Sequence, residues 1–492
     1  MSQHASIFRA SFFTGGAQVV TSLASLARVK FIALVLGVAG VGTNGLLFQA
    51  SGLVQSALGF GIGSSGIRAI AGASALGDSR MLSKTVRSLR TWVWLTGLLC
   101  LGVCTLFSHH LSILTFGNED HAIDFTVLGF AALFQQISAG QAALLRGLRK
   151  IKELAKMNIL AAIGSLLFTA PCIWFLGSHG IAISFLASAC VTLLCSWWFA
   201  RQIYIEPVGL TMVDIWVEGR ELLNAGLAFV GTALAGGLAS YLGALIVRQS
   251  LGLEGNGYYQ AGMGVTVVLV GFVLAAMGQD YYPKLVALMR NGEKVGKHIQ
   301  DQVDMALLMS VPLLTLVSSL APWILHLAYS EKFVSASGVV TWLAVGSLSR
   351  IVSWPLGYAL LAEGKNAVIL SFEIFIAFAS VAFAYLGVKV GGLEGAAIAF
   401  AILELLHWLT LIAITSSRFK FSMPAWLYGH IFAGFLTIMA GRWIGPVAGI
   451  PLSLLSALVC LKIVISRLGP AHRLVKMVAR LPLLGRLCNS SP

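Results

Sequence analysis

Apolar stretches long enough to cross a lipid bilayer follow one another almost without interruption from Phe8 to Ile465. A span of about 20 apolar residues matches a hydrocarbon core about 30 Å thick. Within that core every backbone polar group needs a partner in the protein, so a span is either a helix or a strand of a closed barrel. Barrel strands alternate apolar and polar side chains, whereas these stretches are continuous and rich in Leu, Ala and Gly. The sequence therefore predicts an all-helical (all-α) integral membrane protein.

Composition agrees with this prediction, because 58% of the 492 residues are hydrophobic and 11% are charged, against about 25% charged residues in soluble domains. We predict about fourteen transmembrane helices. Their ranges are 8–36, 43–70, 91–108, 122–145, 156–176, 180–200, 221–247, 258–280, 303–327, 336–361, 367–388, 393–416, 425–443 and 447–466. The first range is too long for a cleavable signal peptide and lacks a small-residue cleavage site.

The chain is also duplicated, because loop patterns of the first half return about 215 residues later. The pairs at this offset are Leu36–Gly40 with Leu251–Gly255, Ala143–Gly147 with Ala359–Glu363, and Gly177–Ala182 with Gly392–Ala397. Duplicated helical halves are the architecture of alternating-access transporters, which hold the substrate between the halves.

The repeat predicts the domain organisation. We expect two pseudo-symmetric six-helix lobes, joined by a cytoplasmic linker and followed by segments that have no counterpart in the repeat. The lobes are residues 1–205 and 221–418, the linker is 206–220, an extra helix pair is 419–466, and a basic amphipathic cytoplasmic tail is 467–492. The tail combines leucines with arginines and lysines, which is typical of a short helix on the anionic lipids of the inner leaflet. A solvated basic tail is the alternative.

The net charge of +14 is compatible with nucleic-acid binding, but the positions of the basic residues argue against it. They gather on alternate loops at 80–90, 146–156, 284–297 and 418–420, and in the tail. The other loops hold few, namely Arg248, Lys332, Lys389 and Arg442. Cytoplasmic loops of membrane proteins carry this excess of Lys and Arg. Both termini are therefore predicted to be cytoplasmic, and no nucleic-acid partner is expected.

The sequence contains no recognisable catalytic or cofactor motif. Gly61–Gly66 has the glycine spacing of a dinucleotide-binding loop, but it lies in a predicted span rather than after a strand. His109 and His110 occupy a short outer loop with no further His or Cys nearby, and most cysteines lie inside apolar spans without metal-ligand spacing. We expect neither enzymatic activity nor a cofactor nor a bound metal.

Polar residues inside the membrane are the candidates for function, because they are costly there. In the first span they recur at intervals of three and four residues, at Ser11, Thr14, Gln18, Thr21, Ser25 and Arg28. This spacing places them on one face of a helix, which should face water rather than lipid. Arg28 lies nine residues before Gly37, roughly 13 Å below the outer boundary. Lys30 is about 200° away around the helix and can instead extend its ammonium group to the outer surface.

Further cationic and polar candidates lie in other spans. Arg350 is in the middle of the tenth span, and Arg248 ends the seventh, where an interfacial anchor is an equally good interpretation. Gln55 and three other glutamines (Gln49, Gln135 and Gln136) lie inside spans, where contacts between helices explain them as well as substrate contacts do. Several cationic groups with few acids near them in sequence suit an anionic substrate, and the fork of arginine suits phosphate.

The acidic candidates are fewer. Glu404 and His407 are separated by three residues in the middle of the twelfth span, Glu373 lies in the eleventh, and Asp280 ends the eighth. A low-dielectric environment favours the neutral form of a carboxyl group, so a buried Glu beside a His is a candidate for proton coupling. The alternative is a structural salt bridge between Glu404 and Arg350.

Several stretches carry a family resemblance. In the first half they are Lys30–Gly37 followed by Ala39 and Gly40, the glycine cluster Gly59–Gly66, Phe116–Asn118 and Leu145–Arg149; in the second half they are Tyr281–Leu285, Ser330–Phe333 and Gly357–Leu360. With these stretches in order, residues 1–418 resemble the polysaccharide-transporter (Wzx-type) branch of the multidrug/oligosaccharidyl-lipid/polysaccharide (MOP) exporter superfamily.

The resemblance implies two six-helix lobes in a V in a bacterial inner membrane. It implies flipping of undecaprenyl-diphosphate-linked oligosaccharide from the cytoplasmic to the periplasmic face, driven by an ion gradient, for surface polysaccharides such as O antigen or exopolysaccharide. A cationic cavity would receive the diphosphate; the basic family position matches Lys30, whereas the polar stripe favours Arg28. The implied partners are the lipid-linked glycan, membrane lipids, and a polysaccharide polymerase with its chain-length regulator.

Two other functions stay open at this stage. A cation-coupled multidrug antiporter of the related MATE type would need acidic residues in the cavity of the first lobe, and the first two spans have none. A non-transporting scaffold for polysaccharide assembly would not need the polar stripe. The role of the last two spans is unassigned; the related peptidoglycan lipid flippases also carry an extra pair.

Overall fold

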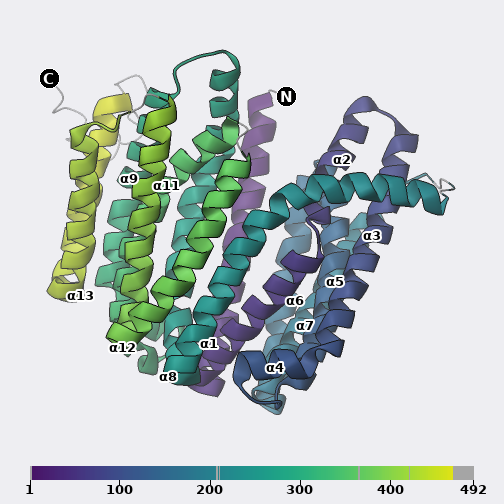
Figure 1. Cartoon of the computed structure of the whole chain (residues 1–492), viewed down its shortest axis with the longest axis horizontal. Helices are drawn as coiled ribbons and strands as arrows, with labels where there is room; N and C mark the ends of the chain where they lie inside the picture. The colour runs from purple at the N-terminus through teal and green to yellow at the C-terminus, as the bar shows by residue number, and fades with distance from the viewer. Residues whose placement is uncertain (1–2, 207–208, 210, 364–365, 420–421, 469–492) are drawn as a thin grey trace. The chain divides into compact units, whose positions relative to one another are not determined.

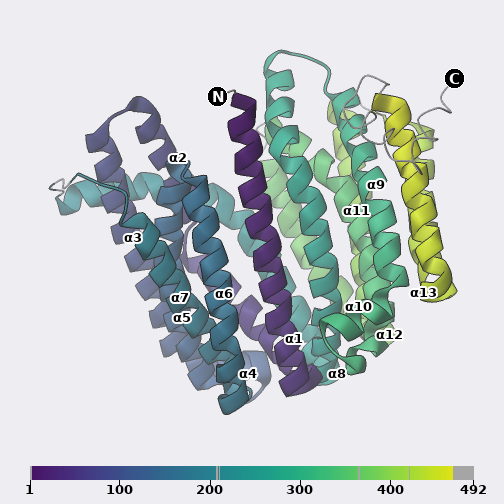
Figure 2. The same cartoon turned by 180° about the vertical axis from the view of Figure 1, so that it is seen from behind.

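The computed structural model describes residues 3–206, 209, 211–363, 366–419 and 422–468. Within these ranges all regular structure is helical, which confirms the predicted fold class. Most of the predicted tail at 467–492 lies outside the described residues. The helices are α1 Gln3–Leu58, α2 Ile62–Leu76, α3 Ser79–Leu106, α4 Ser108–Phe116, α5 Ala122–Gly147, α6 Ile151–Leu176, α7 His179–Ala200, α8 Met212–Arg290, α9 Gly296–Ser319, α10 Ala321–Ala328, α11 Ser337–Ala362, α12 Asn366–Phe419 and α13 Ala425–Leu468, with a 3-10 turn at Glu331–Ala336 (Figures 1 and 2).

Four of these helices each combine two of the predicted spans, joined at glycines whose backbone is not helical. These glycines are Gly37 in α1, Gly252 in α8, Gly391 and Gly392 in α12, and Gly445 in α13. Within the described residues, eight helices are long and apolar enough to cross a membrane by length and composition. That number is consistent with about fourteen spans without fixing the count, because one long helix can contain two spans.

Three predicted ranges differ from the helices. The range 43–70 is interrupted, because α1 ends at Leu58 and α2 begins at Ile62. Phe60 and Gly61 both have positive φ there, and the turn packs so closely on Gly226 that a Cβ at Gly61 would lie 2.7 Å from the Gly226 carbonyl oxygen. The range 303–327 is divided between α9 and α10, and the helix predicted from residue 91 begins at Ser79, where Asp78 accepts a hydrogen bond from the Met81 amide.

The chain forms two compact units. Unit 1 contains residues 1–257 and 328–330, and unit 2 contains 258–327 and 331–492. The first half of α8 therefore belongs to unit 1, where the beginning of this helix packs against α3. Trp92 Nε1 donates a hydrogen bond to the Ile215 carbonyl at 3.0 Å, and the Trp92 and Trp216 rings lie 5.3 Å apart. The predicted lobes, 1–205 and 221–418, place the boundary at the beginning of α8 rather than in its middle, and they stay a prediction.

Both units expose large apolar side chains on their outer helices. On α6, Trp174 and Phe175 are 69% and 81% exposed, and on α12 Phe378 is 71% exposed. In water such surfaces are unfavourable, whereas the apolar interior of a bilayer solvates them. The exposure therefore agrees with a multi-pass membrane protein.

The duplication is also present in the backbone. Gly37 has φ 68° and ψ −158°, and its repeat counterpart Gly252 has φ 75° and ψ −176°. Gly177 has φ 59° and ψ −132°, and its counterpart Gly392 has φ 58° and ψ −134°. Positive φ is strained for residues with a Cβ, which explains why glycine occupies both copies of each turn.

The two glycine-joined helices of unit 1, α1 and α8, cross through a pair of reciprocal contacts. A Cβ at Gly42 would lie 2.2 Å from the Leu253 carbonyl oxygen, and a Cβ at Gly257 would lie 2.1 Å from the Val38 carbonyl oxygen. Gly257 is the repeat counterpart of Gly42, and Leu253 is that of Val38. Asn256 Nδ2 donates a hydrogen bond to the Gly42 carbonyl at 2.9 Å. The backbones therefore approach as closely as glycine allows.

Candidate substrate-binding and ion-coupling residues

Arg28 lies on α1 and packs against an aromatic ring rather than a carboxylate. Its guanidinium carbon is 4.9 Å from the centre of the Phe185 ring on α7, within the range of a cation–π contact. Its Nε is buried without a hydrogen-bond partner, and no acidic side chain pairs with Arg28 among the described residues. A charged group in such a position is costly inside a membrane, and the role of Arg28 in substrate binding stays a prediction.

The polar stripe that leads to Arg28 lies on an accessible face of α1. Gln18 and Ser25 are exposed, and Thr21 and Arg28 are partly exposed. Thr21 uses its hydroxyl group to donate to the Gln18 carbonyl at 2.9 Å, as hydroxyls in membrane helices commonly do. The side chains of Ser11 and Thr14 lie outside the described residues. Lys30 is partly exposed, and its proposed role stays a prediction.

Arg350 of α11 lies in unit 2, where it forms an ion pair with Glu404 of α12. Arg350 Nη2 is 2.5 Å and Nε 3.0 Å from the same oxygen, Oε1 of Glu404. Glu404 is almost fully buried, with 4% of its side chain exposed, whereas 43% of the Arg350 side chain is exposed. The salt bridge between Glu404 and Arg350 that the sequence allows is therefore formed, and the role of Glu404 in proton coupling stays a prediction.

His407 extends this ion pair to a second carboxylate of α12. Its Nδ1 is 3.7 Å from Glu404 Oε2, and its Nε2 is 3.8 Å from Glu373 Oε1. Both separations exceed a normal hydrogen bond, so they become ion pairs only when the imidazole is protonated. Tyr259 of α8 also interacts electrostatically with Arg350. The structure thus brings together Arg350, Glu404, His407 and Glu373, while the side chain of Asp280 lies outside the described residues.

The two arginines occupy related surroundings. The guanidinium carbon of Arg350 is 5.1 Å from the Phe400 ring, and Phe400 is the repeat counterpart of Phe185, on which Arg28 packs. The arginines themselves come from helices that are not counterparts. Glu404 follows Phe400 by one helical turn, whereas the corresponding position in unit 1 is Ala189. Each unit therefore has an arginine over an equivalent phenylalanine, but only unit 2 has the carboxylate at this position.

The other predicted site residues have structural contacts. Arg248 donates a hydrogen bond through Nη2 to the Phe116 carbonyl at the end of α4, a favourable position for a cation at a helix C-terminus. This geometry favours the anchor interpretation of Arg248 over a substrate site. Gln55 Nε2 donates to Ser51 Oγ at 3.0 Å, and the Gln55 carbonyl accepts a hydrogen bond of 3.4 Å from Gln136 of α5. The Gln55 side chain thus bonds within α1, and the contact with α5 is made by its backbone carbonyl.

One polar cluster in unit 1, made of His121, Asp124 and His179, is not among the residues predicted from the sequence. A partial signal was present, because His121 and Asp124 are separated by three residues at the start of the predicted span 122–145. Asp124 is also an acidic residue at the edge of a predicted span, the kind of residue that marks functional sites. The third member, His179, is far away in sequence, and no spacing rule links it to the other two.

These features define the class of the protein: a multi-pass membrane protein built from a duplicated bundle of helices. The family model described as "polysaccharide biosynthesis protein" matches residues 70–338, and the chain belongs to this family. The chain is 21% identical over 225 residues to the lipopolysaccharide biosynthesis protein WzxC of Escherichia coli (strain K12). That match covers 46% of this chain and 45% of the relative, so it spans less than half of either protein.

Solved structures of MOP transporters share the fold. The lipid II flippase MurJ in an inward closed conformation is similar with a TM-score of 0.72 and 12% identity, over 94% of this chain and 99% of that chain. An inward-facing multidrug resistance MATE family transporter of the MOP superfamily is similar with a TM-score of 0.70 and 18% identity, over 81% and 94% of the two chains. At these identities the similarity shows the fold. The family match and the shared fold agree with the Wzx-type MOP resemblance.

Proposed function

We propose that this protein flips an undecaprenyl-diphosphate-linked oligosaccharide, the repeat unit of a surface polysaccharide, from the cytoplasmic to the periplasmic leaflet of a bacterial inner membrane. The family supports a role in polysaccharide biosynthesis, and the excess of basic residues on alternate loops supports cytoplasmic termini. Transport would proceed by alternating access, as in other duplicated helical transporters.

The observation that carries the proposal is the state of Arg28. Its guanidinium group lies in an apolar helix, over Phe185, without a carboxylate partner among the described residues. A diphosphate supplies the missing negative charge and accepts the paired hydrogen bonds that a guanidinium group donates. The accessible polar side chains of Gln18 and Ser25 precede Arg28 on the same helix face, where they suit hydroxyl-rich sugars.

Unit 2 supports the coupling part of the proposal. Arg350 is neutralised by Glu404, so it is less available to a diphosphate than Arg28 is. His407 is placed between Glu404 and Glu373, and its protonation would attract both carboxylates and weaken the hold of Glu404 on Arg350. We propose this group as the point at which a proton gradient acts on transport.

The alternative is cation-coupled export of drugs. The MATE structures favour it only through the shared fold, and the first two spans contain no carboxylate to bind a cationic drug. A deletion strain separates the two functions. It should accumulate undecaprenyl-linked oligosaccharide on the inner leaflet if the protein is a flippase, and change its sensitivity to cationic drugs if the protein is an antiporter.

The experiment compares this deletion strain carrying wild type, Arg28→Ala or Arg28→Lys on a plasmid. Wild type should clear the accumulated lipid-linked oligosaccharide. We expect Arg28→Ala to lower export on the order of a hundredfold at equal membrane abundance, because two charge-assisted hydrogen bonds of about 1.5 kcal/mol each are lost. Arg28→Lys should retain part of the activity. Normal surface glycan from well-expressed Arg28→Ala would contradict the assignment of Arg28.

A further inference from the structure

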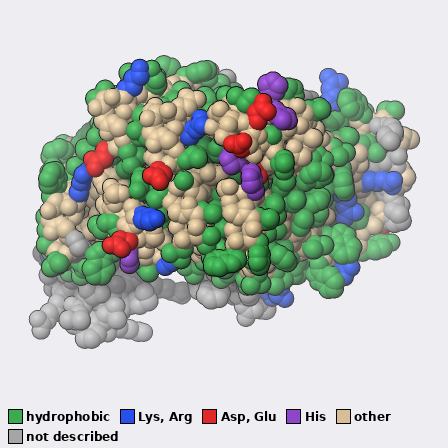
Figure 3. All heavy atoms as spheres, turned by 90° about the horizontal axis from the view of Figure 1, so that it is seen from below, with side chains coloured by type: hydrophobic (Ala, Val, Ile, Leu, Met, Phe, Trp, Pro, Cys, Tyr) green, Lys and Arg blue, Asp and Glu red, His purple; other side chains and the backbone are tan. Residues whose placement is uncertain are grey.

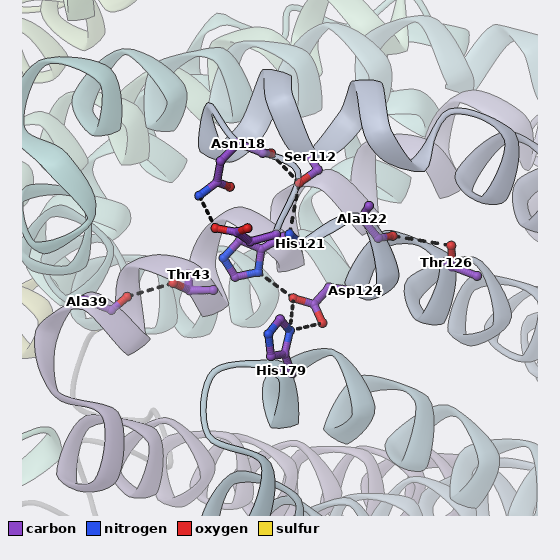
Figure 4. Close-up of polar contacts among 10 residues, drawn as sticks. Ala39, Thr43, Ser112, Asn118, His121, Ala122, Asp124, Thr126 and His179 are labelled. Atoms are coloured by element: carbon purple, nitrogen blue, oxygen red, sulfur yellow. Dashed lines mark hydrogen bonds and ion pairs between the residues drawn. The ribbon is translucent and has the colours of Figure 1, made fainter.

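Three side chains that bind metals in other proteins converge at one end of unit 1. His121 directly precedes α5, Asp124 lies in the first turn of α5, and His179 is the first residue of α7. Figure 4 shows the Asp124 carboxylate between the two imidazole rings. Figure 3 looks onto the helix ends that lie lowest in Figure 1, where histidine and acidic side chains are adjacent on the surface.

The distances are close to those of a coordination sphere. His121 Nδ1 is 2.6 Å from Asp124 Oδ2, and His179 Nδ1 is 3.1 Å and 3.2 Å from the two carboxylate oxygens. One ligand atom from each residue lies within 4.8 Å of the others. In a tetrahedral site with bonds of about 2.0–2.2 Å, neighbouring ligand atoms lie about 3.3–3.6 Å apart. The His179 separations nearly match this range, and the His121 separation must lengthen by about 0.7–1.0 Å.

Two of the three ligands are already held in place. The Asp124 side chain is 2% exposed, and the His121 side chain is 13% exposed. The His121 ring packs 4.0 Å from the Phe116 ring, and its backbone amide donates to Ser112 Oγ at 3.2 Å. The His179 side chain is 52% exposed, so it marks the open side from which an ion would enter.

The donor set matches a particular kind of ion. Two imidazole nitrogens and one carboxylate oxygen, with a water in the fourth position, are a common environment for Zn²⁺ and suit related divalent transition metals. Without an ion, each imidazole can donate its Nδ1 proton to Asp124. Coordination requires the other neutral tautomer, in which the proton is on Nε2 and the Nδ1 lone pair faces the ion.

The surrounding charges also favour a cation. The segment before His121 contains Glu119 and Asp120, which bring negative charge to the same loop. Glu119 lies 3.4 Å from His109, and Asp120 accepts a hydrogen bond from Asn118 at 2.7 Å. The nearby cation Arg248 donates to the Phe116 carbonyl instead of to Asp124. Negative charge around an opening raises the local concentration of cations.

We propose that His121, Asp124 and His179 bind one divalent transition-metal ion, with Zn²⁺ as the best match. The ion would join the beginnings of α5 and α7, which are now linked by hydrogen bonds through Asp124. The competing interpretation is a purely hydrogen-bonded clamp, in which Asp124 stabilises the first turn of α5 and holds both imidazoles. The two interpretations differ in whether an ion is bound, and this can be measured without any transport assay.

The test uses the purified full chain in detergent with any polyhistidine tag removed, stripped with a chelator and then dialysed against Zn²⁺. The variants are His179→Ala, which alters a half-exposed residue and should fold, Asp124→Asn, and His109→Ala in the neighbouring helix α4 as the control. We expect one zinc per chain in wild type and in His109→Ala, measured by elemental analysis. Affinity should fall at least about tenfold in His179→Ala and in Asp124→Asn.

Two further measurements distinguish a bound metal ion from a hydrogen-bonded clamp. Bound Co²⁺ should give the intense visible absorption of a tetrahedral site in wild type and lose it in His179→Ala. Zn²⁺ should raise the thermal midpoint of wild type but not of His179→Ala, because only a bound ion adds stability by mass action. The proposal fails if wild type and His179→Ala bind equal amounts of zinc. It also fails if His179→Ala lowers the thermal midpoint equally in Zn²⁺ and in chelator, which identifies a clamp.

Discussion

Both units place an arginine on equivalent phenylalanines, yet they surround it differently. Arg28 in unit 1 lies over Phe185 without an acidic partner among the described residues, whereas Arg350 in unit 2 lies over Phe400 and is paired with Glu404. The position that corresponds to Glu404 in unit 1 is Ala189, which is 1% exposed. A duplicated fold can therefore keep the same aromatic support and change its charge balance with one side chain. The unpaired arginine suits an anionic ligand, and the paired one suits an internal switch.

The largest expected effect comes from breaking the ion pair of unit 2 on one side. Arg350→Gln leaves the almost fully buried Glu404 carboxylate without its partner. Removing one member of a buried pair costs about 3–5 kcal/mol, and we expect a value near the lower end because 43% of the Arg350 side chain is exposed. Unfolding of the purified protein by SDS titration measures the loss.

The double variant Arg350→Gln/Glu404→Gln is the matched control. It should recover most of the lost stability, because no charge is then left unpaired. In unit 1, Arg28→Gln should change the free energy of unfolding much less, since no acidic side chain among the described residues pairs with Arg28. A double variant as unstable as Arg350→Gln alone would show that the ion pair is not the cause.

A smaller effect is expected at the reciprocal glycine contacts of α1 and α8. Gly42→Ala and Gly257→Ala each place a Cβ within 2.2 Å of a backbone oxygen, which must move. We expect each to lower the free energy of unfolding by about 2 kcal/mol, as overpacking does, and to do so almost equally because the two contacts are repeat counterparts. Gly52→Ala on α1 has nothing within 4 Å of the new Cβ and serves as control. Clearly unequal losses would break the pseudo-symmetry of this crossing.

The smallest effect is expected from a substitution that gives unit 1 the carboxylate of unit 2. Ala189→Glu puts a carboxylate one turn after Phe185, where unit 2 has Glu404, and should pair with Arg28. We expect export to fall about tenfold, which corresponds to about 1.5 kcal/mol for one charge-assisted hydrogen bond withdrawn from the substrate. Ala189→Gln has nearly the same size without the charge. Equal export by the Glu and Gln variants, at equal membrane abundance, would show that charge at this position does not matter.

Much of the fold could be predicted from the sequence, because apolar runs and the glycines that interrupt them are local signals. Gly37 and Gly252 lie in the repeated loop patterns that follow the first and the seventh span, and the structure gives them matching backbone angles. The pairing of Arg350 with Glu404 was one of two readings of the sequence. The break of the second span at Phe60 and Gly61 was not predictable, because it depends on the approach of Gly226 from α8.

Less of the candidate site than of the fold could be predicted from the sequence, because the site depends on contacts between different helices. The periodicity of α1 identifies the stripe that contains Arg28, but it cannot show that the guanidinium group rests on Phe185 of α7. The cluster of His121, Asp124 and His179 combines one local pair with a residue from another helix. Contacts between helices depend on how the bundle packs, and helix periodicity alone contains no information about which faces meet.

The crossing of Gly42 on Leu253 and of Gly257 on Val38 has the isologous form of a two-fold homodimer interface, in which a patch on one copy meets the same patch on the other. Here both copies belong to one polypeptide. In a true homodimer every substitution is made twice, so an arginine or a carboxylate could never be present on one side alone. Because the two copies are fused in one chain, each position is encoded once, and one copy can gain or lose a charged side chain while the glycines that both copies share stay the same.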